Sequence, residues 1–134
     1  MTEQETGLIL DFLKREISPD LIMLFGSAAA GRERPDSDID IAYLGDVVIS
    51  PYARFMLAQK LADLLKREVD LIDLFQASTV MQMQILSTGR VLHCGDERRK
   101  ALFEMQVYKM YAKLNEERAP ILQAIKERGT IYEP

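Results

Sequence analysis

Two short apolar segments separated by a polar turn constrain the fold of this chain more than any other feature. Residues 21–25 read LIMLF, an apolar run that is too short for a helix and fits a buried strand. Residues 38–44 read DIDIAYL, in which carboxylate and aliphatic side chains alternate with the period of two that is typical of a strand. The sequence therefore predicts two strands, the second with Asp38 and Asp40 on one face and aliphatic residues on the other.

The segments on either side predict an α/β fold. Amphipathic or apolar helical patterns occupy residues 3–17, 52–67 and 79–88. Two further strands are predicted at 68–74 and, as an edge strand, at 90–94. A helix of only one or two turns is expected between Gly26 and Gly31. On the helix at 52–67, the residues expected on the buried side are Phe55, Leu57, Leu61, Leu64 and Leu65.

After Asp96 the pattern becomes purely helical. Between 97 and 116, apolar residues fall at i, i+4, i+7, i+8 and i+11, namely Phe103, Val107, Met110, Tyr111 and Leu114. A separate short helix is predicted from Pro120, a favoured first-turn residue, to Gly129. We therefore expect a core at 1–95 and a C-terminal helical extension of the same domain at 96–134.

Composition excludes several classes of protein. The chain has 134 residues, a size typical of one domain with a hydrophobic core. Its formal net charge of −4 disfavours direct nucleic-acid binding, because phosphate binding requires clustered Lys and Arg. The single cysteine excludes an internal disulfide, and no apolar run approaches the roughly 18 residues of a membrane span. We therefore expect a cytoplasmic protein that contacts no membrane.

The turn between the two strands has the features of a metal–phosphate site. Gly26 allows the backbone to approach an anion closely, and Ser27 adds a hydroxyl donor beside the N–H groups of the following helix. After ten intervening residues come Asp38 and Asp40, whose Cα atoms lie about 7 Å apart on one face of a strand. Two such carboxylates can share Mg²⁺, which also prefers waters and substrate phosphate oxygens. The pattern thus predicts a triphosphate and a metal at one turn.

A third carboxylate would complete a two-metal site of the polymerase kind. The strand at 68–74 offers Asp70 and Asp73, which have opposite parity and so project from opposite faces. Asp70 lies within the strand and Asp73 lies nearer its end. We therefore take Asp70 as the third member of the carboxylate triad.

The motif G-S-x10-D-x-D, with a third Asp on a later strand, resembles the nucleotidyltransferase superfamily related to polymerase beta. The resemblance covers roughly residues 8–92, and the small size is similar to its minimal nucleotidyltransferase (MNT) branch. It implies a small α/β nucleotidyltransferase core sheet with flanking helices. It also implies Gly26 and Ser27 as phosphate-loop residues and Asp38, Asp40 and Asp70 as a catalytic triad that holds two Mg²⁺ ions.

The resemblance further implies a biological role. Members of the MNT branch are typically paired with a HEPN-domain protein in type VII toxin–antitoxin systems. There the MNT antitoxin transfers AMP from ATP to a tyrosine of the HEPN ribonuclease toxin, so a hetero-oligomer with that toxin is expected. One position departs from the pattern: many relatives have Arg where this chain has Ala30, and the nearest substitutes for binding the triphosphate are Arg32 and Arg34.

Two other functions compete with this interpretation. An aminoglycoside-type enzyme would transfer a nucleotide to a small molecule, but such enzymes usually carry a further domain that holds the acceptor, and this chain has little room for one. Alternatively, the chain could be a non-catalytic antitoxin that neutralises its toxin by occluding it. An intact triad argues against inactivity.

Overall fold

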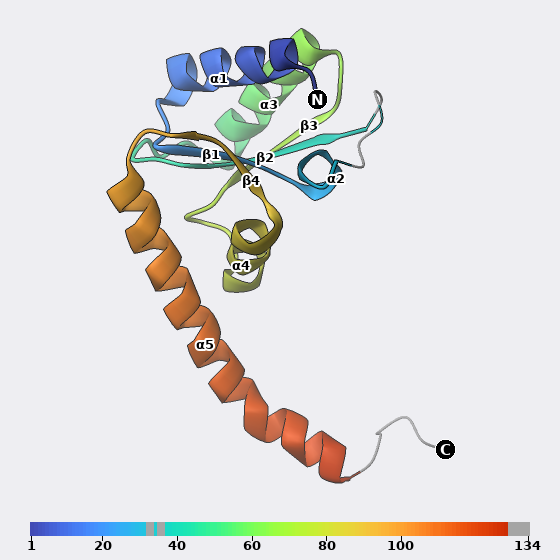
Figure 1. Cartoon of the computed structure of the whole chain (residues 1–134), viewed down its shortest axis with the longest axis vertical. Helices are drawn as coiled ribbons and strands as arrows, with labels where there is room; N and C mark the ends of the chain where they lie inside the picture. The colour runs from blue at the N-terminus through green and yellow to red at the C-terminus, as the bar shows by residue number, and fades with distance from the viewer. Residues whose placement is uncertain (32–33, 35–36, 129–134) are drawn as a thin grey trace.

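A four-stranded mixed sheet lies at the centre of the protein, with helices on both faces (Figure 1). The computed structural model describes residues 1–31, 34 and 37–128. Its strands are β1 (Leu21–Phe25), β2 (Ile39–Leu44), β3 (Val69–Asp73) and β4 (Arg90–Cys94). Their order is β3-β2-β1-β4, in which β1 runs antiparallel to both β2 and β4 while β2 and β3 are parallel. The expected strands are confirmed.

The helices divide between the two faces of the sheet. They are α1 (Glu3–Ile17), α2 (Gly26–Ala29), α3 (Pro51–Leu65), α4 (Thr79–Thr88) and α5 (Glu97–Glu127). Helices α1 and α3 cover one face, whereas α4 and the first turns of α5 cover the other (Figure 1). A hydroxyl or carboxylate side chain accepts a backbone N–H bond at the start of each of the four longer helices, at Thr2, Ser50, Ser78 and Asp96.

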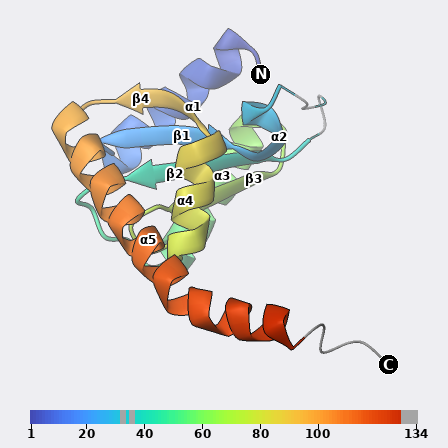
Figure 2. The ribbon, with the colours of Figure 1, turned by 60° about the horizontal axis from the view of Figure 1, so that its bottom comes forward.

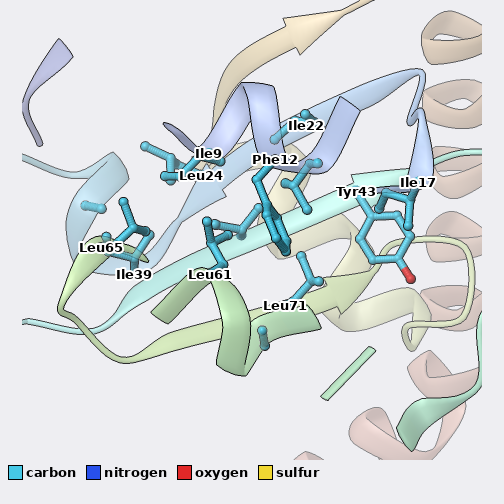
Figure 3. Packing of buried hydrophobic residues seen from close by; sticks show 14 residues of the cluster. Ile9, Phe12, Ile17, Ile22, Leu24, Ile39, Tyr43, Leu61, Leu65 and Leu71 are labelled. Atoms are coloured by element: carbon cyan, nitrogen blue, oxygen red, sulfur yellow. The ribbon is translucent and has the colours of Figure 1, made fainter. Parts of the chain in front are cut away.

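Both faces of the central strands are buried, which explains the unbroken apolar run of β1. Ile22 and Leu24 point to the α1/α3 side, and Leu21 and Met23 point to the α4/α5 side. Figure 3 shows the larger cluster, in which Phe12 of α1 lies between the sheet and α3. The aliphatic residues of β2 that alternate with its aspartates also belong to this cluster and are fully buried.

The buried stripe of α3 differs from the prediction. Ala58, Leu61 and Leu65 face the core, whereas the side chains of Phe55 and Leu64 are 57% and 49% exposed. At 100° per residue, Phe55 and Leu64 lie on opposite flanks of a stripe centred on 58, 61 and 65. The prediction that both are buried was therefore wrong, and a small residue, Ala58, occupies the close contact instead.

The C-terminal segment is one helix rather than two. Helix α5 runs from Glu97 to Glu127 with Pro120 inside it, so the predicted break before Pro120 was wrong. A proline removes one backbone hydrogen bond and bends a helix, but an exposed helix tolerates this without ending. Helix α5 indeed changes direction in its C-terminal part (Figure 2). Gly129, the predicted end of the second helix, lies outside the described residues.

Arg99 fastens the start of α5 to the sheet. Its guanidinium donates to Asp20 Oδ2 at 3.1 Å and to the carbonyl of Gly45 at 3.4 Å, and it also pairs with Asp46. The hydrogen bond that Arg99 donates to Asp46 is the main reason why the pKa of Arg99 is raised above its usual value. Beyond this anchor only Phe103 and Val107 of α5 are buried. In the described part of the chain, no helix combines the length and apolar character needed to cross a bilayer.

The orientation of α3 against the core gives a prediction about stability. Leu61→Ala should lower the free energy of unfolding by about 2–5 kcal/mol, because it leaves a cavity in a fully buried site. Leu64→Ala, three residues away on the exposed flank, should change it by about 0.5 kcal/mol or less. Urea denaturation followed by circular dichroism compares the two variants. Equal losses of unfolding free energy in the two variants would mean that α3 is rotated so that Leu64 is as buried as Leu61.

Candidate active site

Strand pairing brings three predicted site residues into one row across the sheet. Phe25, the last residue of β1, pairs with Asp40 of β2, and Asp40 pairs with Asp70 of the parallel strand β3. Gly26 follows Phe25 directly, so it lies next to Asp40. Because paired residues in a sheet project from the same face, Asp40 and Asp70 point to the same side. That side is the α4/α5 face, where Ala42 is buried.

Gly26 is required by both backbone conformation and space. Its φ of +69° is in the left-handed region, which favours glycine, and a side-chain carbon there would collide with Oδ2 of Asp40. Ser27 follows it, half-buried in α2. Helix α2 has a single turn, as expected, so its backbone N–H groups rather than a long helix dipole are what it offers to a phosphate.

Asp40 lies near two other aspartates, and their charges act on it. Asp38 is exposed immediately before β2, Asp40 is half-buried and Asp70 is exposed on β3. The pKa of Asp40 is raised above its usual value, first by burial and then by the negative charges of Asp70 and Asp38. A bound cation would relieve this repulsion, which makes the cluster suited to a divalent metal.

The aspartates fit a Mg²⁺ site in which the protein supplies only part of the coordination shell. Among the described residues, no three acidic, histidine or cysteine side chains already surround one point. Mg²⁺ does not need such a cage, because it usually binds one or two carboxylates and completes its shell with water and substrate phosphates. Asp38 and Asp40, with Asp70 opposite, supply that kind of partial shell beside Gly26.

Asp73 occupies a different environment from Asp70. It lies on the other face of β3, opposite Tyr43, and it is buried. Its Oδ1 accepts the backbone N–H of Phe75 at 3.0 Å, which holds the turn after β3. The geometry thus separates the two carboxylates of this strand into one beside Asp40 and one within the fold.

The residues proposed to bind the triphosphate are only partly described. The side chain of Arg34 is exposed, and its backbone N–H donates to Ser37 Oγ at 2.7 Å in the turn before Asp38. Ala30, which follows α2, is also exposed. Arg32 lies outside the described residues.

One residue beside the site was missed by the sequence analysis. Arg67, between α3 and β3, has a side chain that is only 6% exposed and donates to the backbone carbonyls of Ser37 and Arg34. It also pairs with Glu5 of α1. No motif contains Arg67, and the only signal in the sequence is a basic residue just before the strand that carries Asp70.

Comparison with known proteins identifies the family. The family model described as "Polymerase beta, Nucleotidyltransferase" matches residues 8–98, which include every residue of the candidate site. The chain belongs to this nucleotidyltransferase family. The polymerase-beta-like fold predicted from the motif is thereby confirmed, and so is the assignment of the chain as a nucleotidyltransferase.

Relatives match the nucleotidyltransferase along almost its whole length. The protein adenylyltransferase MntA of Shewanella oneidensis is 42% identical over 126 residues, which cover 93% of this chain and 90% of MntA. A crystal structure of a toxin–antitoxin with AMP-PNP contains a chain that is 38% identical with a TM-score of 0.81, and the match covers 90% of this chain and 98% of that one.

A third match comes from the structure of a tri-AMPylated Shewanella oneidensis HEPN toxin in complex with MNT antitoxin. The matching chain is 36% identical to this nucleotidyltransferase with a TM-score of 0.78, and the match covers 94% of this chain and 99% of that one. The matches therefore extend beyond the core into the C-terminal helix.

The charge repulsion at Asp40 gives a prediction for pH. A carboxyl group whose pKa is raised on folding destabilises the protein above that pKa, and the effect disappears at acidic pH, where the group is protonated in both states. Without metal, Asp40→Asn should therefore unfold at an equal or higher temperature than wild type at neutral pH. The difference should shrink as the pH falls toward about 4.

Thermal denaturation across this pH range measures the effect. Asp11→Asn, on the exposed side of α1, is the control and should show no such pH-dependent difference. A melting temperature lower than that of wild type for Asp40→Asn at neutral pH would contradict the raised pKa of Asp40, because it would mean that the ionised carboxylate makes a net favourable interaction.

Proposed function

We propose that this chain is the antitoxin of a type VII toxin–antitoxin system. In this role it is an Mg²⁺-dependent protein adenylyltransferase that moves AMP from ATP to a tyrosine of a HEPN ribonuclease toxin in the cytoplasm. The observation that carries the proposal is that Asp40 and Asp70 lie in one row across the sheet, with Gly26 next to Asp40, in a chain that matches antitoxins along nine-tenths of its length. ATP as substrate is supported by the relative that was crystallised with AMP-PNP.

Each residue of the candidate site has a role in the transfer. Backbone N–H groups at Gly26 and the hydroxyl of Ser27 bind the phosphates of ATP, while Asp38, Asp40 and Asp70 would hold Mg²⁺. That cation, when bound, neutralises charge on the phosphates and favours ionisation of the attacking hydroxyl. The tyrosine oxygen of the toxin forms a bond to the α-phosphorus, and the bond between the α-phosphorus and the pyrophosphate oxygen breaks. Asp70 accepts the phenolic proton.

Substitution of the paired aspartates tests the reaction. Asp38→Ala or Asp40→Ala should lower the rate of AMP transfer by about a hundredfold or more, because each removes a carboxylate that holds the cation. Both variants should remain folded, since neither side chain is part of the hydrophobic core. The assay uses labelled ATP and purified toxin. Transfer at the wild-type rate by either variant would contradict the metal assignment.

The same variants distinguish catalysis from occlusion. An enzyme loses neutralisation of the toxin ribonuclease together with AMP transfer. An occluding antitoxin would still neutralise the toxin after Asp38→Ala and Asp40→Ala. Measurement of ribonuclease activity in the presence of each variant therefore decides between the two modes.

The third carboxylate has a matched control on its own strand. Asp70→Asn should reduce transfer as strongly as the substitutions at Asp38 and Asp40, because it removes the proposed proton acceptor next to Asp40. Asp73→Asn should instead lower the melting temperature and leave transfer by the folded protein nearly unchanged, since Asp73 holds the turn at Phe75. The reverse order would mean that the wrong carboxylate was assigned to the triad.

Helix α5 supplies the proposed contact with the toxin. The face that buries Phe103 and Val107 continues toward the C-terminus with Met110, Ile121 and Ile125, which are exposed. Beyond the sheet this face has no packing partner in the described part of the chain (Figures 1 and 2). Met105 and Tyr108, which are 66% and 44% exposed, lie on the opposite side of α5, because they follow Phe103 by two and five residues. An exposed apolar face like that of Met110, Ile121 and Ile125 typically marks an interface.

Charged substitutions test this surface. Ile121→Glu and Ile125→Glu should weaken copurification with the HEPN toxin while leaving the circular dichroism spectrum and melting temperature close to wild type, because both side chains are exposed. Lys109→Glu, on an already polar exposed site of the same helix, is the control. A complex that survives both apolar substitutions would place the toxin elsewhere.

A further inference from the structure

The guanidinium of Arg67 connects three segments that are distant in sequence. It donates to the carbonyl of Ser37 from Nε at 3.1 Å and from a terminal nitrogen at 3.0 Å, and to the carbonyl of Arg34 at 3.2 Å. The other terminal nitrogen contacts Glu5 Oε2 at 3.2 Å. A planar fork that reaches two carbonyls and a carboxylate at once is a property of arginine that lysine lacks.

These bonds hold the backbone on both sides of Asp38. The carbonyl of Ser37 belongs to the peptide group that precedes Asp38, and Arg67 binds it. The N–H of Ile39 belongs to the peptide group that follows Asp38, and it donates to the carbonyl of Glu68 at 2.9 Å. Two consecutive residues, Arg67 and Glu68, therefore fix both peptide groups that flank the first aspartate of the D-x-D motif.

Glu5 offsets the energetic cost of burying the Arg67 guanidinium. A buried guanidinium without an anion nearby would carry a large desolvation cost. Glu5 supplies the charge, and it is itself held because it forms the capping box of α1 with Thr2. The pKa of Glu5 is lowered, chiefly by the hydrogen bond from the backbone N–H of Thr2 and further by Arg67, so it stays ionised. The start of α1 is thus tied to the turn that delivers Asp38.

We propose that Arg67 is a positioning residue that fixes the backbone at Asp38 and so directs its carboxylate toward the cation held with Asp40. This inference rests on the proposed function of the site, because it gives Asp38 a ligand role. In this role Arg67 acts through the Ser37–Ile39 segment and not as a ligand of the cation. Loss of such a supporting contact typically weakens metal binding or activity by roughly ten- to a hundredfold.

Arg99 is a matched control for a purely structural arginine. It too pairs with carboxylates and a backbone carbonyl and joins distant segments, at 29% side-chain exposure. Its partners are Asp20, Gly45 and Asp46, at the start of β1 and the end of β2, whereas Asp38 stands before the start of β2. Arg99→Ala should therefore lower stability without altering the site.

The experiment measures binding of AMP-PNP by calorimetry at increasing Mg²⁺ concentrations, together with the melting temperature and the kcat and KM for transfer to the toxin. For Arg67→Ala, the Mg²⁺ concentration at half-maximal AMP-PNP binding should rise roughly tenfold or more, with a fall in kcat. For Arg99→Ala, the Mg²⁺ concentration at half-maximal AMP-PNP binding, which does not involve the toxin, should stay within about twofold of wild type although its melting temperature falls. Arg67→Lys should lie between wild type and Arg67→Ala, because one ammonium group cannot reach all three acceptors.

The outcomes separate this inference from the proposed function. Wild-type protein that binds no AMP-PNP with Mg²⁺ would overturn the proposed function itself. Two results would overturn only the positioning role. In the first, the wild-type protein binds AMP-PNP and Arg67→Ala needs no more Mg²⁺ than wild type does. In the second, Arg99→Ala raises the Mg²⁺ requirement as much as Arg67→Ala does. If Arg67→Ala does not fold, the same measurement is made on Arg67→Lys, which keeps the buried charge. An unchanged Mg²⁺ requirement in Arg67→Lys then contradicts the proposal, and a raised requirement supports it.

Discussion

The candidate site depends on the pairing of β2 with two neighbours of different direction. Antiparallel pairing with β1 sets Asp40 beside the residue before Gly26, and parallel pairing with β3 sets Asp40 beside Asp70. Because side chains alternate along a strand, a shift of one residue in either register would turn a carboxylate to the other face. The fully buried Ile39 and Ile41 oppose such a shift, since it would turn both of them out of the cluster under α1 and α3 and turn Asp40 into it. The hydrophobic core therefore maintains the alignment of the acidic residues.

Much of this could be predicted from the sequence, for a physical reason. The alternation in β2 and the unbroken apolar run of β1 directly reflect which faces are buried, so the strands and the common face of Asp38 and Asp40 followed from periodicity alone. The choice between Asp70 and Asp73 followed from the same parity, although their roles in transfer stay predictions. Periodicity says nothing of strand order or direction, and these became clear only from the structure.

The sequence-based predictions were wrong or incomplete where contacts between distant segments determine which residues are buried, where a helix ends and which groups pair. Phe55 and Leu64 are apolar and near the right spacing, but the close approach of α3 selects the stripe that includes Ala58. Pro120 is a good first-turn residue and also fits inside an exposed helix, and local sequence does not separate the two cases. Arg67 was missed because two of its acceptors are main-chain carbonyls, which any residue type provides, about 30 residues away along the chain.

Helix α5 leaves the core on the same face of the sheet that bears Asp40 and Asp70. A toxin held along that helix would be tethered on the side where transfer takes place. Tethering turns later transfers into intramolecular events, whose rates depend on local effective concentration instead of on bulk concentration. One encounter between antitoxin and toxin would then support successive modifications of the same molecule before the two dissociate.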